Sequence, residues 1–279
     1  MQTPRRTLAA EVEHAEADGN RRFVEHQRLA DADYAGDFLS LDGAGALFCF
    51  PGSDMNYVAG LGFDHRPDIS LIFDQIDAFY RTRESPWTLA VSSLADPEIV
   101  DMAAQRGYRP GPSAHMWGKR LGRLDSPPSA IPFQIVEVGP EASHKWAHTA
   151  ARGFGDGIAD PATEQILLGF ARVPGTRLYV ALDRDGAAAA SAAMAFGSEH
   201  AKLFSGSTLP AFRGRGIQRA LLHHRLREAQ ARGLNWAIVQ TDPNTTSERN
   251  VARLGFDLLY TKQTLNSPPA ASQNQGGFS

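Results

Sequence analysis

Apolar residues recur along this chain with two different periods, and the period changes many times. From Pro67 to Arg81, six apolar residues recur at spacings of three and four, which predicts an amphipathic helix. Residues 7–30 are rich in Ala, Glu and Arg and also predict a helix. The apolar runs Ala46–Phe50 and Tyr57–Gly62 predict two strands joined by a turn. Short strands mixed with helices therefore open the chain.

The same kind of pattern continues, is interrupted once, and then restarts. Before the interruption, strands are expected at 88–94 and 114–121, with a helix at 96–106. After it, the expected strands are 133–138, 177–182, 187–196, 200–209, 236–241 and 258–265, and the expected helices are 141–152, 162–172, 216–232 and 247–254. This succession predicts a fold of the α/β or α+β class.

The interruption is a segment of eleven residues that predicts a linker. Residues 122–132 contain three prolines together with Gly and Ser. We therefore expect one domain at 1–121 and a second at 133–265. Residues 266–279 contain a single Phe among Pro, Ala, Ser, Gln, Asn and Gly, so they are expected to be a disordered tail.

Composition narrows the classes of function. The chain has 279 residues, 42% of them hydrophobic, and a formal net charge of −3. This balance does not suggest a nucleic-acid partner, because such proteins normally carry a basic face. No segment approaches the roughly 20 apolar residues that span a bilayer, so no membrane partner and a cytoplasmic location are expected. The single cysteine, Cys49, lies in an apolar run and is expected to be a buried core residue.

The most informative chemistry lies where an expected strand leads into an expected helix. Gly214 and Gly216 let the backbone curl there, and the first N–H groups of the helix have no partner within it. These amides and the helix dipole favour a phosphate, and Arg213 and Arg215 could add hydrogen bonds. An ordinary glycine turn with surface arginines is the alternative. A Walker P-loop is absent, and Arg219 occupies the third glycine position of the Rossmann pattern.

Two motifs resemble those of the GCN5-related N-acetyltransferase (GNAT) superfamily. Arg213-Gly-Arg-Gly-Ile-Gln218 is similar to the family's Arg/Gln-x-x-Gly-x-Gly/Ala turn, with Gln218 where Gly or Ala is usual. Residues 242–256 resemble the family's Asn-containing loop, short helix and Leu-Gly-Phe ending. The motifs occur in the family's order and spacing. The resemblance covers 133–265, whereas residues 1–121 resemble at most a degenerate second copy without a cofactor.

The resemblance implies two GNAT-like domains, each a mixed, mostly antiparallel sheet flanked by helices, with the cofactor on the C-terminal one. The implied cofactor is acetyl-CoA or another acyl-CoA. The implied contacts are Ser207, Thr208 and Leu209 for the pantetheine arm; Arg213, Gly214, Arg215, Gly216, Ile217 and Gln218 for the pyrophosphate; and Asn244, Ser247 and Asn250 on the other side. Helix capping is an equal alternative for Asn244 and Ser247.

The implied reaction is attack of an amine on a thioester, with a base to take the amine proton. Candidate catalytic residues are His200, Ser205 and Asp242, although a solvated hairpin residue is the favoured interpretation of His200. The family's usual acid, a tyrosine, is replaced by Val251. No metal is expected, because His223 and His224 point apart on a helix.

The expected function is therefore N-acyltransfer to the primary amine of a small molecule. Protein N-acetylation is one alternative, and a non-catalytic acyl-CoA sensor is another, which the missing tyrosine keeps open. The glycine-rich loop at residues 153–157 could cover the acceptor, with Asp156 or Asp160 meeting its cationic amine.

Overall fold

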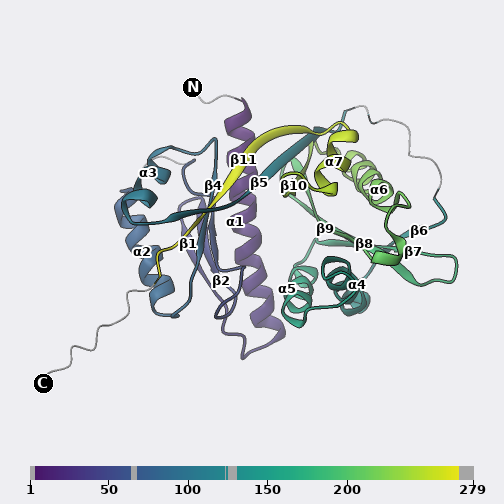
Figure 1. Cartoon of the computed structure of the whole chain (residues 1–279), viewed down its shortest axis with the longest axis horizontal. Coiled ribbons are helices and arrows are strands. Elements are labelled where there is room, and N and C mark those ends of the chain that lie inside the picture. The colour runs from purple at the N-terminus through teal and green to yellow at the C-terminus, as the bar shows by residue number, and fades with distance from the viewer. Residues whose placement is uncertain (1–3, 64–67, 123, 125–130, 270–279) are drawn as a thin grey trace, which may run out of the picture. The chain divides into compact units, whose positions relative to one another are not determined.

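The computed structural model describes residues 4–63, 68–122, 124 and 131–269. The chain separates into two compact units. Unit 1 contains Met1–Val24, Asp33–Ser113 and Lys262–Ser279, and unit 2 contains Glu25–Ala32 and Ala114–Thr261. Figure 1 shows helices and strands in both units. Among the described residues, no helix is both long enough and apolar enough to cross a membrane.

Unit 1 holds five strands in the order β1-β2-β3-β4-β11. The strands are β1 (Asp37–Leu41), β2 (Ala44–Phe48), β3 (Tyr57–Ala59), β4 (Thr88–Ser92) and the second half of β11 (Asp257–Asn266), and the helices are α1 (Pro4–Ala30), α2 (Ile69–Arg81) and α3 (Glu98–Gln105). Neighbouring strands are antiparallel except for β3 and β4, which are parallel and connected through α2. A parallel pair needs such a crossover.

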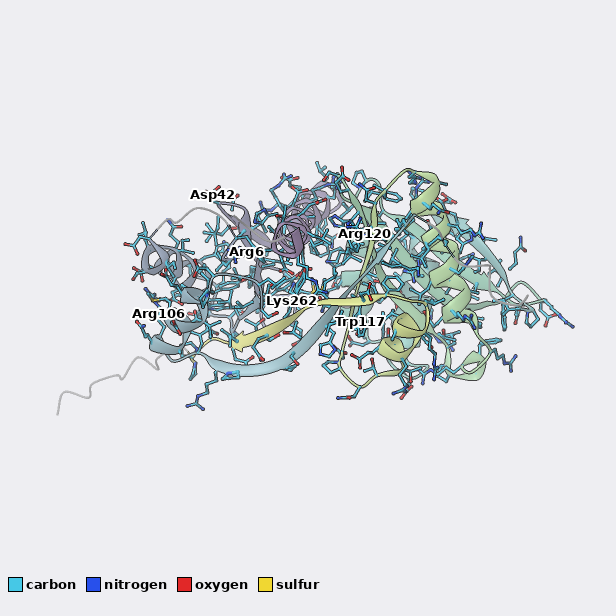
Figure 2. All side chains as sticks on the ribbon, turned by 90° about the horizontal axis from the view of Figure 1, so that it is seen from above. Arg6, Asp42, Arg106, Trp117, Arg120 and Lys262 are labelled. Atoms are coloured by element: carbon cyan, nitrogen blue, oxygen red, sulfur yellow. The ribbon has the colours of Figure 1, made fainter. Side chains whose placement is uncertain are left out.

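The two faces of this sheet carry different helices. Val58 and Leu265 pack into an apolar core with Phe73 and Ile76 of α2. The strand residues of opposite parity face α1, because successive side chains of a strand alternate between faces. Lys262 of β11, labelled in Figure 2, forms ion pairs with Glu13 and Glu16 of α1. One face is therefore apolar and the other carries buried charge.

Unit 2 repeats this plan on a larger scale. Its strand order is β5-β10-β9-β8-β7-β6. The strands are β5 (Arg109–Arg120), β6 (Gln134–Val138), β7 (Arg177–Leu182), β8 (Ala188–Phe196), β9 (His200–Thr208) and β10 (Trp236–Thr241), and the helices are α4 (Ser143–Phe154), α5 (Pro161–Arg172), α6 (Ile217–Ala231) and α7 (Thr246–Arg253). The strands β6 to β9 are antiparallel, and β9 and β10 are parallel through α6.

Helices cover both faces of the unit 2 sheet, with α4 and α5 on one face and α6 and α7 on the other (Figure 1). Small alanines of β8 alternate between the two cores: Ala192 packs on the α6 side and Ala193 on the α4 side. Trp146 of α4 anchors the second core and donates its indole N–H to the Ala192 carbonyl at 3.0 Å. This packing confirms the predicted mixed sheet flanked by helices.

The observed elements match most of the predicted ones, with three differences. The strand β1 was not predicted, and only Leu41 of its five residues is buried. The strand β5 begins at Arg109 rather than at 114. Pro110 and Pro112 argue against a strand, yet they alternate, so their missing N–H groups fall on one edge. The helix α3 begins at Glu98 and has Pro97 rather than Asp96 at its N-cap.

The division into units also falls elsewhere than at the expected 121 and 133. The boundaries at 113/114 and 261/262 lie inside the long strands β5 and β11, and residues 25–32, which include the end of α1, belong to unit 2. Most of the expected linker, residues 123 and 125–130, and the tail from 270 to 279 lie outside the described residues.

Candidate functional site

The helix α6 begins at a glycine that leaves its first amides open. Gly214 and Gly216 both adopt left-handed backbone, with φ of 76° and 78°. Gly216 is the N-cap and has no side chain to cap the helix. The Ala220 N–H donates to the Gly216 carbonyl at 3.1 Å, so the preceding amides of the first turn have no partner within the helix. The exposed turn can therefore bind an anion.

The strands β9 and β10 part before the chain reaches this turn. Their parallel pairing joins His200–Leu203 to Trp236–Val239. Beyond Leu203, β9 continues to Thr208 paired with β8. Over its last five residues, β9 is therefore not paired with β10. A backbone edge of this kind can bind an extended amide-containing chain.

A bulge lies at the point of parting. Between the pairs Ser191–Ser207 and Ala193–Phe204, one residue of β8 faces two residues of β9. Ser205 takes a positive φ of 49° to accommodate the extra residue. Bulges of this kind turn backbone groups out of the ladder and are frequent beside active sites.

The three residues expected to bind pantetheine already use some of their hydrogen-bonding groups within the chain. The Leu209 N–H donates to Ala189 O and its carbonyl accepts from Phe212 N–H, both at 2.9 Å, so neither group is open. The Ser207 hydroxyl lies 3.0 Å from that of Ser191, inside the protein. Thr208 accepts a hydrogen bond at Oγ1 from Gln218 Nε2 at 2.9 Å. The two backbone groups of Leu209 thus have partners within the chain.

The Arg213 side chain bonds to the end of β9 and to the loop after α4. It donates to the Gly153 carbonyl at 3.0 Å and to the Thr208 carbonyl at 3.2 Å, and it forms an ion pair with Asp156 at 2.6 Å. Three acceptors therefore hold its guanidinium. Arg213 connects the turn to the glycine-rich loop after α4, and Asp156 is already paired with a cation.

The other arginine and the second loop aspartate also have local partners. The Arg215 guanidinium lies 5.4 Å from the centre of the Phe212 ring, a cation–π contact. Asp160 caps α5 by accepting from the Thr163 N–H at 2.8 Å. This hydrogen bond, with that from the Thr163 hydroxyl, lowers the pKa of Asp160. Asp160 is therefore a helix cap.

The loop between β10 and α7 is organised around Glu248. Thr245 is the N-cap of α7 and accepts from the Glu248 N–H at 3.2 Å. Asn244 takes a positive φ of 64° and donates its N–H to Glu248 Oε2 at 2.6 Å. Ser247, the expected cap, lies exposed within the first turn, and Asn250 follows on the same helix. The capping role therefore belongs to Thr245.

The three candidate catalytic residues are not brought together. Ser205 occupies the bulge of β9, and Asp242 is exposed directly after β10. His200 begins β9 and is 1% exposed, so it is not a solvated hairpin residue. Five residues of strand separate it from Ser205, a distance of about 16 Å. The bulge therefore favours Ser205 and Asp242 over His200.

A histidine of β5, which was not a candidate from the sequence, lies beside the last residue of β10. His115 of β5 is in register with Thr241, two residues past the last β9–β10 pair. Its Nδ1 lies 2.5 Å from Glu248 Oε1. This hydrogen bond and the one from the Asn244 N–H lower the pKa of the Glu248 carboxyl. His115 and Glu248 are 133 residues apart, so no local pattern predicts their contact. The Thr245-x-x-Glu248 capping pattern is the sequence signal that indicates a fixed position for this carboxylate.

In unit 1, the region that follows the parallel pair of strands is occupied by protein groups. After β3 and β4, the Gly62 carbonyl accepts from the Asp96 N–H at 2.8 Å and from Arg6 Nη2 at 2.9 Å. Arg6 also donates to the Leu94 carbonyl. Backbone and guanidinium thus bridge the segments that follow this parallel pair.

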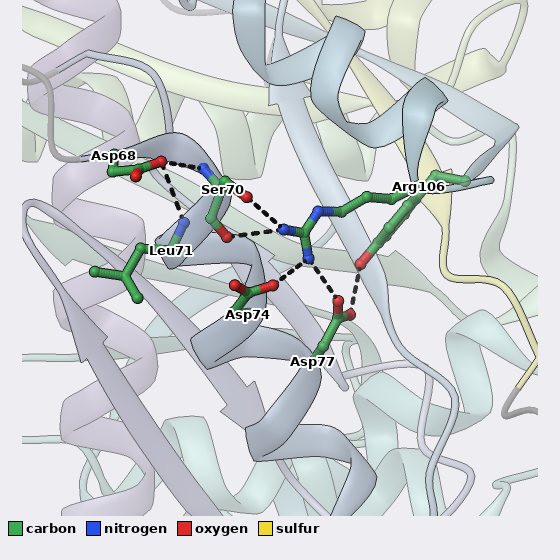
Figure 3. A network of polar contacts seen from close by, with 7 residues as sticks. Asp68, Ser70, Leu71, Asp74, Asp77 and Arg106 are labelled. Carbon is green, nitrogen blue, oxygen red and sulfur yellow. Dashed lines mark hydrogen bonds and ion pairs between the residues drawn. The ribbon is translucent and has the colours of Figure 1, made fainter.

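The helix α2 of unit 1 is capped by a carboxylate where α6 is open. Asp68 Oδ1 accepts from the Ser70 N–H at 2.9 Å and the Leu71 N–H at 3.4 Å (Figure 3). A hollow of about 410 Å³ beside this cap is lined by Asp68, Ile69, Ser70, Glu98, Asp101, Met102 and Gln105. Its three carboxylates would repel a phosphate.

The described part of the chain contains no group of three or more His, Cys, Asp or Glu residues that could hold a metal ion. Cys49 is buried, and burial raises the pKa of its thiol, which suits a core residue and not a nucleophile.

Comparison with known proteins identifies the class. Residues 144–256 match the acetyltransferase (GNAT) family model. This segment contains the α6 turn, the parting strands and α7. The chain therefore carries a GNAT acetyltransferase domain, and acyl transfer from coenzyme A is the chemistry of that family. No curated protein sequence matches the chain.

Solved structures extend the likeness of fold to both units. A GCN5-related N-acetyltransferase from Kribbella flavida has a TM-score of 0.61 at 15% identity, covering 90% of this chain and 95% of that one. One from Sphaerobacter thermophilus gives 0.58 at 15%, covering 91% and 92%. A tandem GNAT protein from the clavulanic acid biosynthesis pathway gives 0.57 at 15%, covering 73% and 70%. The predicted GNAT fold is confirmed.

Proposed function

We propose that unit 2 transfers an acetyl or short acyl group from acyl-CoA to the primary amine of a small molecule. One observation carries this proposal: the uncapped, glycine-opened start of α6 follows the unpaired end of β9 after a short 3-10 helix at Pro210–Phe212. A diphosphate on the α6 amides and a pantetheine chain along this end of β9 would direct the thioester to the bulge at Ser205.

Unit 1 is proposed to bind no acyl-CoA. The Asp68 carboxylate occupies the α2 amides, and Arg6 bridges the segments after β3 and β4. Either feature would have to be displaced before a coenzyme could enter. The expected stoichiometry is therefore one coenzyme per chain.

His115 joins Ser205 and Asp242 as a candidate for the general base. The ionised Glu248 carboxylate can only accept, so His115 donates from Nδ1, and a neutral imidazole in this arrangement would carry its lone pair on Nε2. A histidine held in this way can take a proton from an amine through a water.

Replacing His115 by Gln is expected to lower kcat/KM by about 100-fold, the usual contribution of a general base. The acetyl-CoA Kd should change little, because the change leaves the α6 turn intact. The matched control is His148→Gln, which breaks an exposed pair with Glu164 at 2.9 Å. Equal loss of activity in both variants would remove His115 as the base.

A screen of amine acceptors tests the proposed function itself. Thiol release from acetyl-CoA would be followed across amino acids, amino sugars, polyamines and peptides with free N-termini, beside calorimetry of acetyl-CoA binding. Turnover with a small amine is expected, with one coenzyme bound per chain. Turnover with peptides alone would favour protein acylation.

Binding without turnover on any amine would favour an acyl-CoA sensor. One observation supports this second candidate. Val251, at the position of the family's usual tyrosine, is fully buried in the core beneath α6. It offers no proton to a leaving thiolate.

A further inference from the structure

An arginine is buried in unit 2 without a carboxylate partner. Arg225 lies on the face of α6 that packs on the sheet and is 2% exposed. Its Nη1 donates to the carbonyls of Ala193 at 2.8 Å and Phe204 at 3.3 Å, and its Nε donates to Leu221 O at 3.2 Å. No ion pair involves this residue within the described chain. Burying an unpaired charge lowers the free energy of unfolding, by roughly several kcal/mol. A contribution to stability alone therefore does not explain why an arginine occupies this position.

The two sheet carbonyls that bind Arg225 mark one side of the β9 bulge. Ala193 and Phe204 are partners in register, and the extra residue of β9 follows directly. Nη2 lies 3.6 Å from the point where a Cβ on Gly206 would stand. In the part of the chain that is described, Nη2 donates to no acceptor. The guanidinium therefore lies beneath the segment of β9 that has parted from β10.

We infer that Arg225 is a positioning residue for acyl transfer, which holds the β9 bulge in shape and stabilises negative charge on the thioester oxygen above it. This inference rests on the proposed function. The amine nitrogen bonds to the thioester carbon, and the C=O electron pair moves to oxygen. The C–S bond then breaks, coenzyme A leaves as thiolate, and the base takes the amine proton. Arg225 exchanges no proton in these steps.

Its charge persists under the conditions of the reaction. Burial lowers the pKa of Arg225 to about 10, which leaves the guanidinium protonated at neutral pH. A fixed charge in a site of low dielectric stabilises a developing oxyanion without reorganisation. The backbone amides of the bulge and this charge would act on the same oxygen.

The test uses acetyl-CoA labelled with ¹³C at the thioester carbonyl and follows its infrared band when bound. Binding to the wild type is expected to shift the band to lower frequency, because donors polarise the carbonyl. Arg225→Met should lose most of this shift, keep the acetyl-CoA Kd within about threefold, and lower kcat by about 100-fold. Its Tm should stay or rise, since apolar replacement of a buried charge is often stabilising. Arg227→Met, at an exposed position of α6, is the matched control.

The outcomes separate this inference from the proposed function. A wild type that fails to bind acetyl-CoA overturns both. A folded Arg225→Met variant with the wild-type carbonyl band and kcat overturns the role of Arg225 alone. If Arg225→Met does not fold, Arg225→Lys carries the test. A lysine cannot reach both carbonyls and the bulge at once, so a reduced shift supports the inference and an unchanged shift overturns it.

Discussion

Replacing Gly216 by Asp is expected to weaken acetyl-CoA binding by at least about 100-fold. Gly216 has a φ of 78°, which costs an L-residue about 1–2 kcal/mol. Space is not the obstacle, since a Cβ there would lie 3.6 Å from Ile131 Cγ2. The larger effect comes from charge. The new carboxylate would occupy the amides of the first turn of α6 and repel the diphosphate.

A glycine at the other end of the same helix supplies the control for this change. Gly233 has a φ of 77° and open space around its Cβ position. Gly233→Asp therefore adds the same strain and the same charge away from the turn. Calorimetric titration with acetyl-CoA should show binding to Gly233→Asp and none to Gly216→Asp. Comparable affinity for the two variants would place the coenzyme elsewhere.

Replacing Lys262 by Ala is expected to lower the free energy of unfolding by about 3–5 kcal/mol, the usual effect of removing one partner of a buried ion pair. Lys262 Nζ lies 3.0 Å from both Glu13 Oε2 and Glu16 Oε1, and all three side chains are at least 90% buried. Tyr57 also donates to Glu16 at 3.2 Å. Without the ammonium, two carboxylates would remain buried together.

The titration of Lys262 gives this prediction a pH dependence. Burial alone would lower the pKa of Lys262, but Glu13 and Glu16 raise it above its ordinary value of 10.5. The resulting stabilisation is fully present below the unfolded-state pKa of 10.5. It is lost as the pH rises through the higher pKa of the folded state.

Urea unfolding of Lys262→Ala and of Lys145→Ala, an exposed lysine of α4, measures the difference. A loss below about 1 kcal/mol for Lys262→Ala would contradict a buried ion cluster, because that is the size of a surface pair. Adding Glu13→Gln and Glu16→Gln to a Lys262→Met variant should recover part of the loss.

The sequence predicted those parts of the site that depend on local signals. Gly214 and Gly216 marked the turn because only glycine takes left-handed backbone without cost. The helix after them followed from its apolar period. The short helix α7 was predicted from its position before Leu254-Gly-Phe256.

The rest of the site depends on contacts between distant residues. Arg225 lies on the same buried face as Leu221 and Leu222, but an arginine at such a position is normally read as exposed. His115 and Glu248 meet only because β5 pairs with β10. The ion pair between Arg213 and Asp156, 57 residues apart, was not predicted either. Each of these contacts depends on pairing between segments that are far apart in the sequence. No local pattern of residues predicts such pairing.

The bond between Lys262 and Glu16 imposes an order on biosynthesis. These residues are 246 positions apart. At about 5–20 residues per second, a ribosome needs roughly 12–50 s to travel from one to the other. Throughout that interval α1 carries two glutamates whose counter-ion does not yet exist. Unit 1, most of which is synthesised before unit 2, is therefore completed after it, when β11 supplies Lys262.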